Sequence, residues 1–276
     1  MIAFDFEYHK PASITEAIET FDAIHAQGKK AFLFSGGTEF ITFSRVNKIS
    51  ADAVIDIKGI PECNVLEIQD NELIIGAAVS LNKITQSNLF PLLGQAVKQI
   101  ADHTSRNKIT IGGNMNSQLI YKESLLPLLL TDAKVKIAGS TGEEIVPLEA
   151  IFNKKQSQEE FLVQIMIDTS YLELPSISLK RTKFSKVGYP VVSLAALVKD
   201  HKIRVALSGV CNFPFRSSEI EAILNDASIE IDERVEQVLA HLPSRIVDDI
   251  QGSAAYREFV LKNILFDMMK GLKIAK

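Results

Sequence analysis

The sequence predicts an α+β fold, in which strands and helices are segregated along the chain. Near the N-terminus an amphipathic helical pattern lies between short apolar runs, and a hairpin pattern follows in the middle of the chain. Near the C-terminus three strand-like runs come before three helical patterns. Strands followed by helices favour α+β over an alternating parallel α/β sheet. The length of 276 residues is compatible with two domains or one large domain.

The first 55 or so residues are expected to form strand, helix and strand. Ser13 is the predicted N-cap of the helix, with Glu16 three residues later as in a capping box, and Gly28 is expected to end it. The helical spacing is carried by Ile14, Ala17, Ile18 and Phe21. Short strands are predicted at residues 31–34 and 53–57.

The middle of the chain, to about residue 165, is expected to contain a hairpin, three helices and a strand. The predicted hairpin turns at Gln69, Asp70 and Asn71. Helices are predicted from residue 80 and at 91–101 and 125–130, and a strand at 135–138. For the rest of the chain, three antiparallel strands are predicted at 177–180, 191–198 and 203–210, and helices at 217–224, 235–242 and 254–272.

Two stretches combine adjacent glycines with short polar residues after an apolar run. One is Phe-Leu-Phe-Ser-Gly-Gly-Thr-Glu-Phe at residues 32–40, and the other is Arg-Asn-Lys-Ile-Thr-Ile-Gly-Gly-Asn at 106–114. Glycine lets the backbone approach a ligand closely, and successive N–H groups in a concavity bind phosphate. The two stretches could hold the two phosphates of a pyrophosphate. The alternative is that both are ordinary connections, since neither matches the Rossmann or P-loop pattern.

These stretches resemble the double-glycine loops of the FAD-binding (medium) subunit of the molybdenum hydroxylase family. The family patterns are close to A-G-G-T-D/E-L and R-N-x-x-T-I-G-G-N, and the family includes the flavin subunits of xanthine dehydrogenase and carbon monoxide dehydrogenase. The second stretch is the more specific of the two. Further similarity runs through residues 73–78, 125–130, 207–210 and 252–257, so the resemblance covers nearly the whole chain.

The resemblance implies a two-part FAD-binding domain at residues 1–165, with mixed and antiparallel sheets and subdomains of about 1–55 and 56–165. A C-terminal flavoprotein domain at 166–276 would hold a three-stranded antiparallel sheet plus helices. The implied function is electron transfer, from iron–sulfur clusters on a small partner subunit through FAD to NAD or another acceptor. The oxidised substrate would bind a large molybdopterin subunit, and this chain would need no catalytic acid or base.

The resemblance also implies which residues bind FAD. The residues matching the first loop are Phe34, Ser35, Gly36, Gly37, Thr38 and Glu39, and those matching the second are Thr110, Ile111, Gly112, Gly113 and Asn114. Glu123 takes the place of an Asp that relatives carry near the flavin, but the neighbouring Ser-Pro pair is missing; the alternative is a solvated carboxylate at a helix start. Lys180 loosely matches a family lysine near the flavin. Independently of the resemblance, an aromatic ring can stack on a flavin, and Tyr189 is favoured among the five tyrosines; the alternative is a half-buried tyrosine with its hydroxyl satisfied.

Composition and cysteine usage limit the other classes of function. The net charge of −4 gives no basic surface for nucleic acid. No apolar run approaches a membrane span and no signal peptide is recognisable, so a cytoplasmic location is expected. Cys63 and Cys211 are too few to ligate an iron–sulfur cluster, and no zinc motif is present, so no metal is expected on this chain.

The sequence leaves open which enzyme the chain serves and what its C-terminal apolar cluster does. The run Glu-Ser-Leu-Leu-Pro at residues 123–127 favours a xanthine or purine dehydrogenase over a carbon monoxide dehydrogenase. A stand-alone FAD-dependent oxidoreductase and a module that has lost flavin are the other possibilities. An apolar cluster lies near the C-terminus and consists of Leu261, Ile264, Leu265, Phe266, Met268 and Met269. One hypothesis is that it contributes to a surface facing a partner subunit, and the other is that it is buried in the core.

Overall fold

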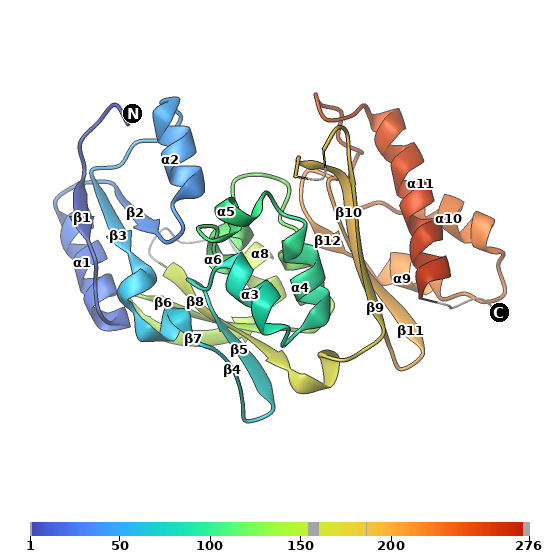
Figure 1. Ribbon diagram of the computed structural model, residues 1–276, viewed down its shortest axis with the longest axis horizontal. Helices are drawn as coiled ribbons and strands as arrows, with labels where there is room; N and C mark the ends of the chain where they lie inside the picture. The colour runs from blue at the N-terminus through green and yellow to red at the C-terminus, as the bar shows by residue number, and fades with distance from the viewer. Residues whose placement is uncertain (1, 154–159, 186, 273–276) are drawn as a thin grey trace. The chain divides into compact units, whose positions relative to one another are not determined.

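The computed structural model describes residues 2–153, 160–185 and 187–272, and the chain divides into two compact units (Figure 1). The first unit consists of Met1–Ile84, His103–Asn116 and Asp132–Thr169. The second consists of Thr85–Asp102, Ser117–Thr131 and Ser170–Lys276. The two shorter segments of the second unit therefore interrupt the sequence of the first.

The first unit begins with a parallel three-stranded sheet of order β1-β3-β2, formed by β1 (Glu7–His9), β3 (Ala53–Asp56) and β2 (Ala31–Phe34). Helix α1 (Ile14–Ala26) connects β1 to β2, and α2 (Thr38–Arg45) connects β2 to β3. The predicted N-cap is confirmed, since Ser13 Oγ accepts from the Glu16 N–H at 3.1 Å; the Glu16 carboxylate accepts from the Ala12 N–H at 2.7 Å, one residue before the N-cap position of a capping box. Gly28 follows the helix with φ +71°, a conformation that glycine adopts without strain.

The first unit also contains an antiparallel five-stranded sheet of order β4-β5-β8-β6-β7. Its strands are β4 (Leu66–Gln69), β5 (Glu72–Gly76), β6 (Lys134–Gly139), β7 (Gly142–Pro147) and β8 (Glu160–Asp168). The predicted hairpin is present, and Asp70 and Asn71 both have positive φ, as a two-residue turn of this type requires. The helical segments of this part are η1 (Ile57–Gly59), η2 (Pro61–Asn64), α3 (Leu81–Ser87), α5 (His103–Arg106), α6 (Ile111–Met115) and α8 (Leu148–Asn153).

The second unit is built on an antiparallel sheet of order β12-β11-β10-β9. The strands are β9 (Ser176–Thr182), β10 (Pro190–Lys199), β11 (Lys202–Ser208) and β12 (Phe215–Arg216). Both faces of β10 are covered, because Pro190–Leu197 is buried without alternation. Figure 1 shows α9 (Ser218–Leu224), α10 (Ile231–Ala240) and α11 (Ala254–Gly271) on one side of this sheet. Helices α4 (Pro91–Lys98) and α7 (Leu125–Leu129) also contact it, and η3 (Thr169–Tyr171) precedes β9.

The α+β prediction is confirmed, but several elements differ from it, and the strands β7 and β8 of the five-stranded sheet were not predicted. The C-terminal sheet has a fourth strand, β12, which is only two residues long and therefore has no periodicity to reveal it. The helix predicted at 91–101 ends at Lys98, and Ala101 has φ +46°. Within the second glycine stretch, Ile111 starts a short helix, α6, which was not predicted.

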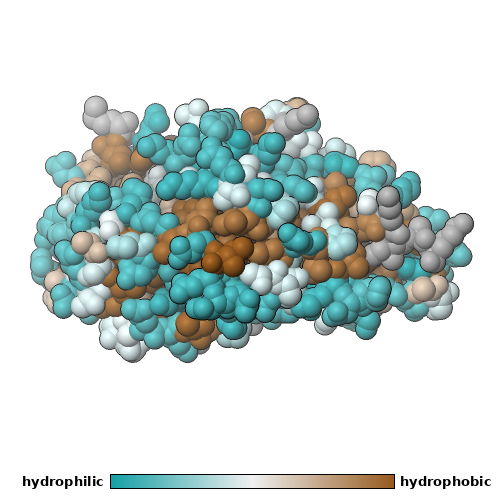
Figure 2. Space-filling view, turned by 60° about the horizontal axis from the view of Figure 1, so that its bottom comes forward, coloured by the Kyte–Doolittle hydropathy of each residue, from teal (hydrophilic) through white to brown (hydrophobic). Residues whose placement is uncertain are grey.

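The apolar cluster of α11 lies in the core of the second unit, so the hypothesis that it faces a partner is wrong. Leu261, Ile264, Leu265 and Met268 are each 0% exposed and Met269 is 2% exposed, and Phe266 packs against the same core. Large apolar side chains reach the surface elsewhere, above all Phe184 and Ile250. Figure 2 shows hydrophobic areas within a largely hydrophilic surface. Among the residues described, no helix is long and apolar enough to cross a membrane.

Candidate cofactor site

The first glycine stretch connects β2 to α2 through a left-handed turn. Gly37 is the N-cap of α2 and has φ +72°. A Cβ at this position would also lie 2.3 Å from the ring of Phe34. The N–H groups in the first turn of a helix have no acceptor inside the helix, and the helix dipole places positive potential there. Residues 35–39 thus form an arrangement suited to an anion such as phosphate.

The two glycine stretches are in direct contact within the first unit. A Cβ on Gly36 would lie 2.1 Å from the carbonyl oxygen of Lys108 and 3.2 Å from the nitrogen of Thr110. No side chain fits in that space, so the backbone of the first stretch packs on the backbone of the second. The structure therefore brings together two sets of residues that are about seventy positions apart in the sequence.

The second stretch uses several of its N–H groups inside the protein. Thr110 is the N-cap of α6, and its Oγ1 accepts from the Gly113 N–H at 3.2 Å. The N–H groups of Ile111 and Gly112 donate to the carbonyls of Val79 and Ala77, both at 3.0 Å. Donors for an anion therefore have to come chiefly from the first stretch.

The remaining residues of the second stretch also hold the chain together. A Cβ on Gly112 would lie 2.8 Å from the Ala77 carbonyl oxygen, whereas one on Gly113 would meet only Thr110 Oγ1, at 3.0 Å. Asn107 Oδ1 accepts from the buried Asn82 side chain at 2.6 Å, and Arg106 Nε donates to Asn82 Oδ1 at 3.2 Å. Arg106 and Asn107 thus fix α5 to α3.

The first stretch contains a polar atom that is suited to a ligand. Ser35 Oγ is buried, and within the described part of the chain it has no hydrogen-bond partner. Buried hydroxyl groups without a partner are uncommon in folded proteins. A phosphate oxygen bound at this turn would supply the missing partner. The Ser35 hydroxyl, unpaired within the described residues, and the contact between the stretches are two features that a bound pyrophosphate, as in FAD, would fit.

Glu123 and Lys180 form a buried ion pair in the second unit. Lys180 Nζ lies 3.3 Å from Glu123 Oε1, and the side chains are 5% and 8% exposed. Lys180 Nζ also donates to the Gln99 carbonyl at 2.8 Å. The alternative of a solvated carboxylate at Glu123 is therefore wrong, because the side chain is buried against a cation.

A residue that sequence reasoning missed lies beside this pair. Ser193 in β10 is directly opposite Lys180 in β9 and Ser208 in β11, so the three side chains share one face of the sheet. Ser193 Oγ is buried and, among the described residues, has no hydrogen-bond partner. Only the strand register places Ser193 next to Lys180; no local motif marks it.

Breaking the buried pair is expected to destabilise the second unit. Lys180→Met should lower the free energy of unfolding by about 3–5 kcal/mol, because Glu123 would stay buried without its partner. Adding Glu123→Leu should recover much of this loss, since no charge then remains in the core. Urea denaturation measures both effects. The exposed pair of Lys134 and Glu72 supplies the control, Lys134→Met, and an equal loss in the two lysine variants would contradict the expectation.

The two similarity segments near the C-terminus meet at one buried side chain. Arg257 is 0% exposed, and its guanidinium donates to the carbonyls of Val191, Gly209 and Gly252. It also forms an ion pair with Asp249 at 2.5 Å. Burial alone would raise the pKa of Asp249, but the hydrogen bond and charge of Arg257 together with the N–H groups of Gln251 and Gly252 outweigh burial and lower that pKa. These segments thus serve the stability of the second unit.

Tyr189, the tyrosine favoured for flavin stacking, stacks on another tyrosine in the structure. Its ring lies 5.3 Å from that of Tyr121 at an interplanar angle of 22°. Tyr121 is 8% exposed and its hydroxyl group donates to Asp249, whereas Tyr189 is 53% exposed. One face of the Tyr189 ring is therefore occupied within the second unit.

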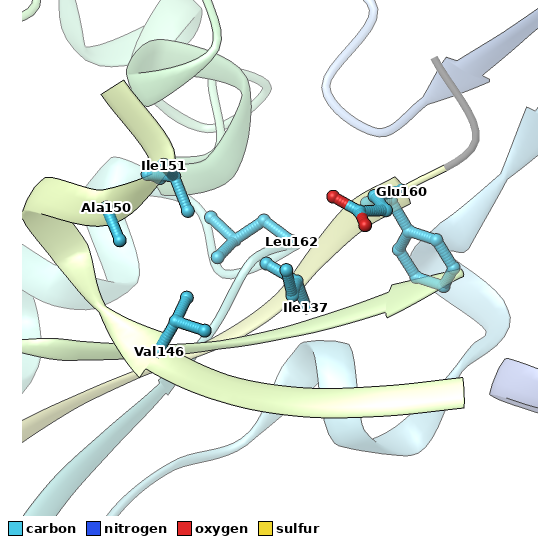
Figure 3. A pocket seen from close by; sticks show the side chains of 7 residues that line it. Ile137, Val146, Ala150, Ile151, Glu160 and Leu162 are labelled. Atoms are coloured by element: carbon cyan, nitrogen blue, oxygen red, sulfur yellow. The ribbon is translucent and has the colours of Figure 1, made fainter. Parts of the chain in front are cut away.

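A small pocket in the first unit does not suit a charged cofactor. It is lined by Ile137, Val146, Ala150, Ile151, Glu160, Phe161 and Leu162. Figure 3 shows apolar side chains around it and one carboxylate, that of Glu160, which would repel phosphate. Across the described ranges, no group of three His, Cys, Asp or Glu residues is arranged to hold a metal ion.

Known proteins similar to this chain are FAD-binding domains and subunits or medium chains of dehydrogenases. A family model described as the FAD binding domain in molybdopterin dehydrogenase matches residues 4–169. The glyceraldehyde dehydrogenase medium chain of Sulfolobus acidocaldarius is 25% identical, over 96% of this chain and 98% of the relative. The carbon monoxide dehydrogenase medium chain of Hydrogenophaga pseudoflava is 30% identical, over 55% of this chain and 53% of the relative. The xanthine dehydrogenase FAD-binding subunit of Escherichia coli O157:H7 is 28% identical, over 52% of this chain and 50% of the relative.

Solved structures show the same fold. A structure of carbon monoxide dehydrogenase from Hydrogenophaga pseudoflava that lacks the Mo-pyranopterin moiety superposes with a TM-score of 0.88 at 22% identity. Quinoline 2-oxidoreductase from Pseudomonas putida 86 superposes with a TM-score of 0.87 at 20% identity. Both alignments cover 99% of this chain and 99% of the other.

Proposed function

The chain belongs to the family of FAD-binding domains in molybdopterin dehydrogenases, and on that basis we propose that it is the electron-transfer flavoprotein subunit of a molybdenum hydroxylase. Its cofactor is FAD. The observation that carries the proposal is the backbone contact between Gly36 and residues 108–110, which joins the two family loops into one site.

The first loop supplies most of the binding groups for FAD. Residues 34–39 would hold the pyrophosphate through the turn at Gly37 and the hydroxyl of Ser35. Residues 110–114 would support that turn from the other side, since Gly36 packs on Lys108 and on Thr110, where this loop begins. Bound FAD supplies the ability to exchange one or two electrons, which connects iron–sulfur clusters with a two-electron acceptor. Within the scheme the chain orients the cofactor and moves no proton itself.

The redox partners would be other polypeptides. Cys63 and Cys211 fall short of the four ligands that a cluster takes. Burial raises the pKa of the Cys63 thiol to about 12 and also raises that of Cys211, so neither is a ready thiolate ligand. Relatives are named medium chains or FAD-binding subunits. We infer a small iron–sulfur subunit, a large molybdopterin subunit, and NAD or another acceptor.

The substrate is a further proposal, with xanthine or another purine first and carbon monoxide as the alternative. The relatives act on chemically different substrates by name, so they support the class of complex rather than one substrate. A stand-alone FAD-dependent oxidoreductase is the remaining alternative. We also propose that the FAD-binding domain comprises residues 1–165 and the C-terminal domain residues 166–276. We propose further that Glu123 and Lys180 contact the flavin, and that the protein is cytoplasmic.

Electron transfer without substrate oxidation is the expected behaviour of the chain alone. Purified chain loaded with FAD should pass electrons from NADH to a dye acceptor but should not oxidise xanthine, other purines or carbon monoxide. Substrate oxidation should appear only when the iron–sulfur and molybdopterin subunits are added. The assay measures dye reduction for each substrate, with and without those subunits. Substrate-dependent dye reduction by the chain alone would refute the relay and favour the stand-alone enzyme.

A further inference from the structure

Three side chains form a connected network next to the first glycine stretch. The Tyr8 hydroxyl donates to Asp56 Oδ2 at 2.5 Å, and Lys58 Nζ lies 2.8 Å from the same oxygen. Lys58 Nζ also donates to the Ser35 carbonyl at 2.7 Å and lies 4.6 Å from the centre of the Phe34 ring. The Ser35 carbonyl is therefore tied, through one lysine, to a carboxylate on the neighbouring strand.

The fold places these groups at the ends of parallel strands. Phe34 pairs with Asp56 at the carboxyl ends of β2 and β3, and Tyr8 lies on β1, which is paired with β3 on its other side. Asp56 is 2% exposed, and its Oδ1 accepts from the Lys58 N–H at 2.9 Å. Burial would raise the pKa of Asp56, but hydrogen bonds from Lys58 and Tyr8 outweigh it and lower that pKa. The hydrogen bond between the Tyr8 hydroxyl and Asp56 raises the pKa of Tyr8 to about 12.

We propose that Lys58 is a positioning residue that orients the peptide between Ser35 and Gly36 for binding the diphosphate of FAD. This inference rests on the proposed function. The peptide unit is planar and trans, so its carbonyl and its N–H point in opposite directions. Because Lys58 holds the Ser35 carbonyl, the Gly36 N–H is held pointing away from Lys58, before any ligand binds. A donor that is already oriented costs less ordering when the anion arrives.

The pairing of Lys58 with Asp56 distinguishes this role from simple charge attraction. The lysine charge is balanced by a carboxylate 2.8 Å away, so the pair attracts a distant phosphate weakly. Loss of Lys58 should consequently weaken FAD binding by a similar factor at low and high salt. A lysine that attracted the diphosphate directly would instead show a loss that shrinks as salt increases.

The experiment is an FAD titration of the full chain after removal of its flavin, followed by quenching of flavin fluorescence at two salt concentrations. Lys58→Met should raise the dissociation constant about tenfold, the scale of one charged hydrogen bond. Lys58→Arg, which keeps a donor, should restore most of the affinity. The control is Lys48→Met, which removes an exposed lysine that contacts only a phenylalanine ring among its described contacts, at 5.9 Å. It should bind FAD as the wild type does.

A second variant keeps the inference testable if Lys58→Met does not fold. Tyr8→Phe removes one hydrogen bond from Asp56 at a half-exposed position and should weaken FAD binding about threefold. Combined with Lys58→Met it should add little, because Tyr8 reaches the Ser35 carbonyl only through Asp56 and Lys58. Thermal unfolding of the flavin-free variants separates lost affinity from lost folding.

The outcomes separate this inference from the proposed function. If the wild-type chain takes up no FAD, the proposed function and the inference both fail. If the wild type binds FAD and both Lys58→Met and Tyr8→Phe bind it equally well, only the inference is overturned. A loss in Lys58→Met that shrinks as salt increases would also overturn it, in favour of direct attraction by the lysine charge.

Discussion

Replacing Gly36 with alanine is expected to raise the dissociation constant for FAD by about ten- to a hundredfold. The added Cβ would lie 2.1 Å from the Lys108 carbonyl oxygen, and because that atom belongs to the backbone, the two glycine stretches would have to move apart. Overpacking of this kind typically costs 1–3 kcal/mol, which corresponds to about that range of affinity. The measurement is an FAD titration of the flavin-free chain.

Gly94→Ala is the matched control for this variant. Gly94 is buried, whereas Gly36 is half-buried, and a Cβ on Gly94 in the middle of α4 would come no closer than 3.9 Å to a residue outside the helix. Alanine is a better helix former than glycine, so this variant should fold at least as well as the wild type and bind FAD unchanged. Equal FAD affinity in the two variants would contradict a site formed by contact of the glycine stretches.

Replacing Arg257 with methionine is expected to lower the free energy of unfolding by roughly 3 kcal/mol or more. Three backbone carbonyls and Asp249 would lose their donor in the core of the second unit, and unsatisfied buried groups are costly. Arg181→Met is the control: Arg181 also pairs with an aspartate, Asp267 at 2.6 Å, but at the surface. Exposed pairs contribute at most about 1 kcal/mol. Similar urea denaturation midpoints for the two variants would contradict this role of Arg257.

The difference between the wild type and Arg257→Met should also depend on pH. The pKa of Asp249 is lower in the folded protein than its ordinary value of 3.8. Its ion pair therefore stabilises the fold above that ordinary value, and the contribution is lost as the pH falls through the folded pKa. The difference in the free energy of unfolding between the wild type and Arg257→Met should therefore become smaller in acid. A difference that became larger in acid would show that Asp249 does not stabilise the fold through its charge.

Local patterns were sufficient to predict the elements that depend on neighbouring residues. The N-cap at Ser13 and the turn at Asp70 and Asn71 are short-range features, and both are present. The two-residue strand β12 depends instead on pairing with β11, which no local pattern records. The start of α6 at Ile111 likewise depends on the carbonyls of Val79 and Ala77, which accept the N–H groups of its first residues.

The four glycines of the candidate site could not be ranked from the sequence. Gly37 needs a positive φ, whereas Gly36 and Gly112 need space beside another backbone segment, and Gly113 has the most room. Glu123 and Lys180 could be proposed separately by resemblance, but their pairing depends on the tertiary fold, which brings Glu123 within 3.3 Å of Lys180. Lys58 was missed because a single lysine after a strand carries no motif, and only the Ser35 carbonyl 2.7 Å away gives it a role.

The binding of FAD to the contacting glycine stretches is tested most directly by the absorption spectrum and flavin content of the purified full chain. The wild type should show flavin bands and, on denaturation, release about one FAD per chain, since nothing in the proposed site calls for a covalent bond. Gly36→Ala, prepared in the same way, should carry much less. A colourless wild-type chain that takes up no added FAD would contradict the assignment.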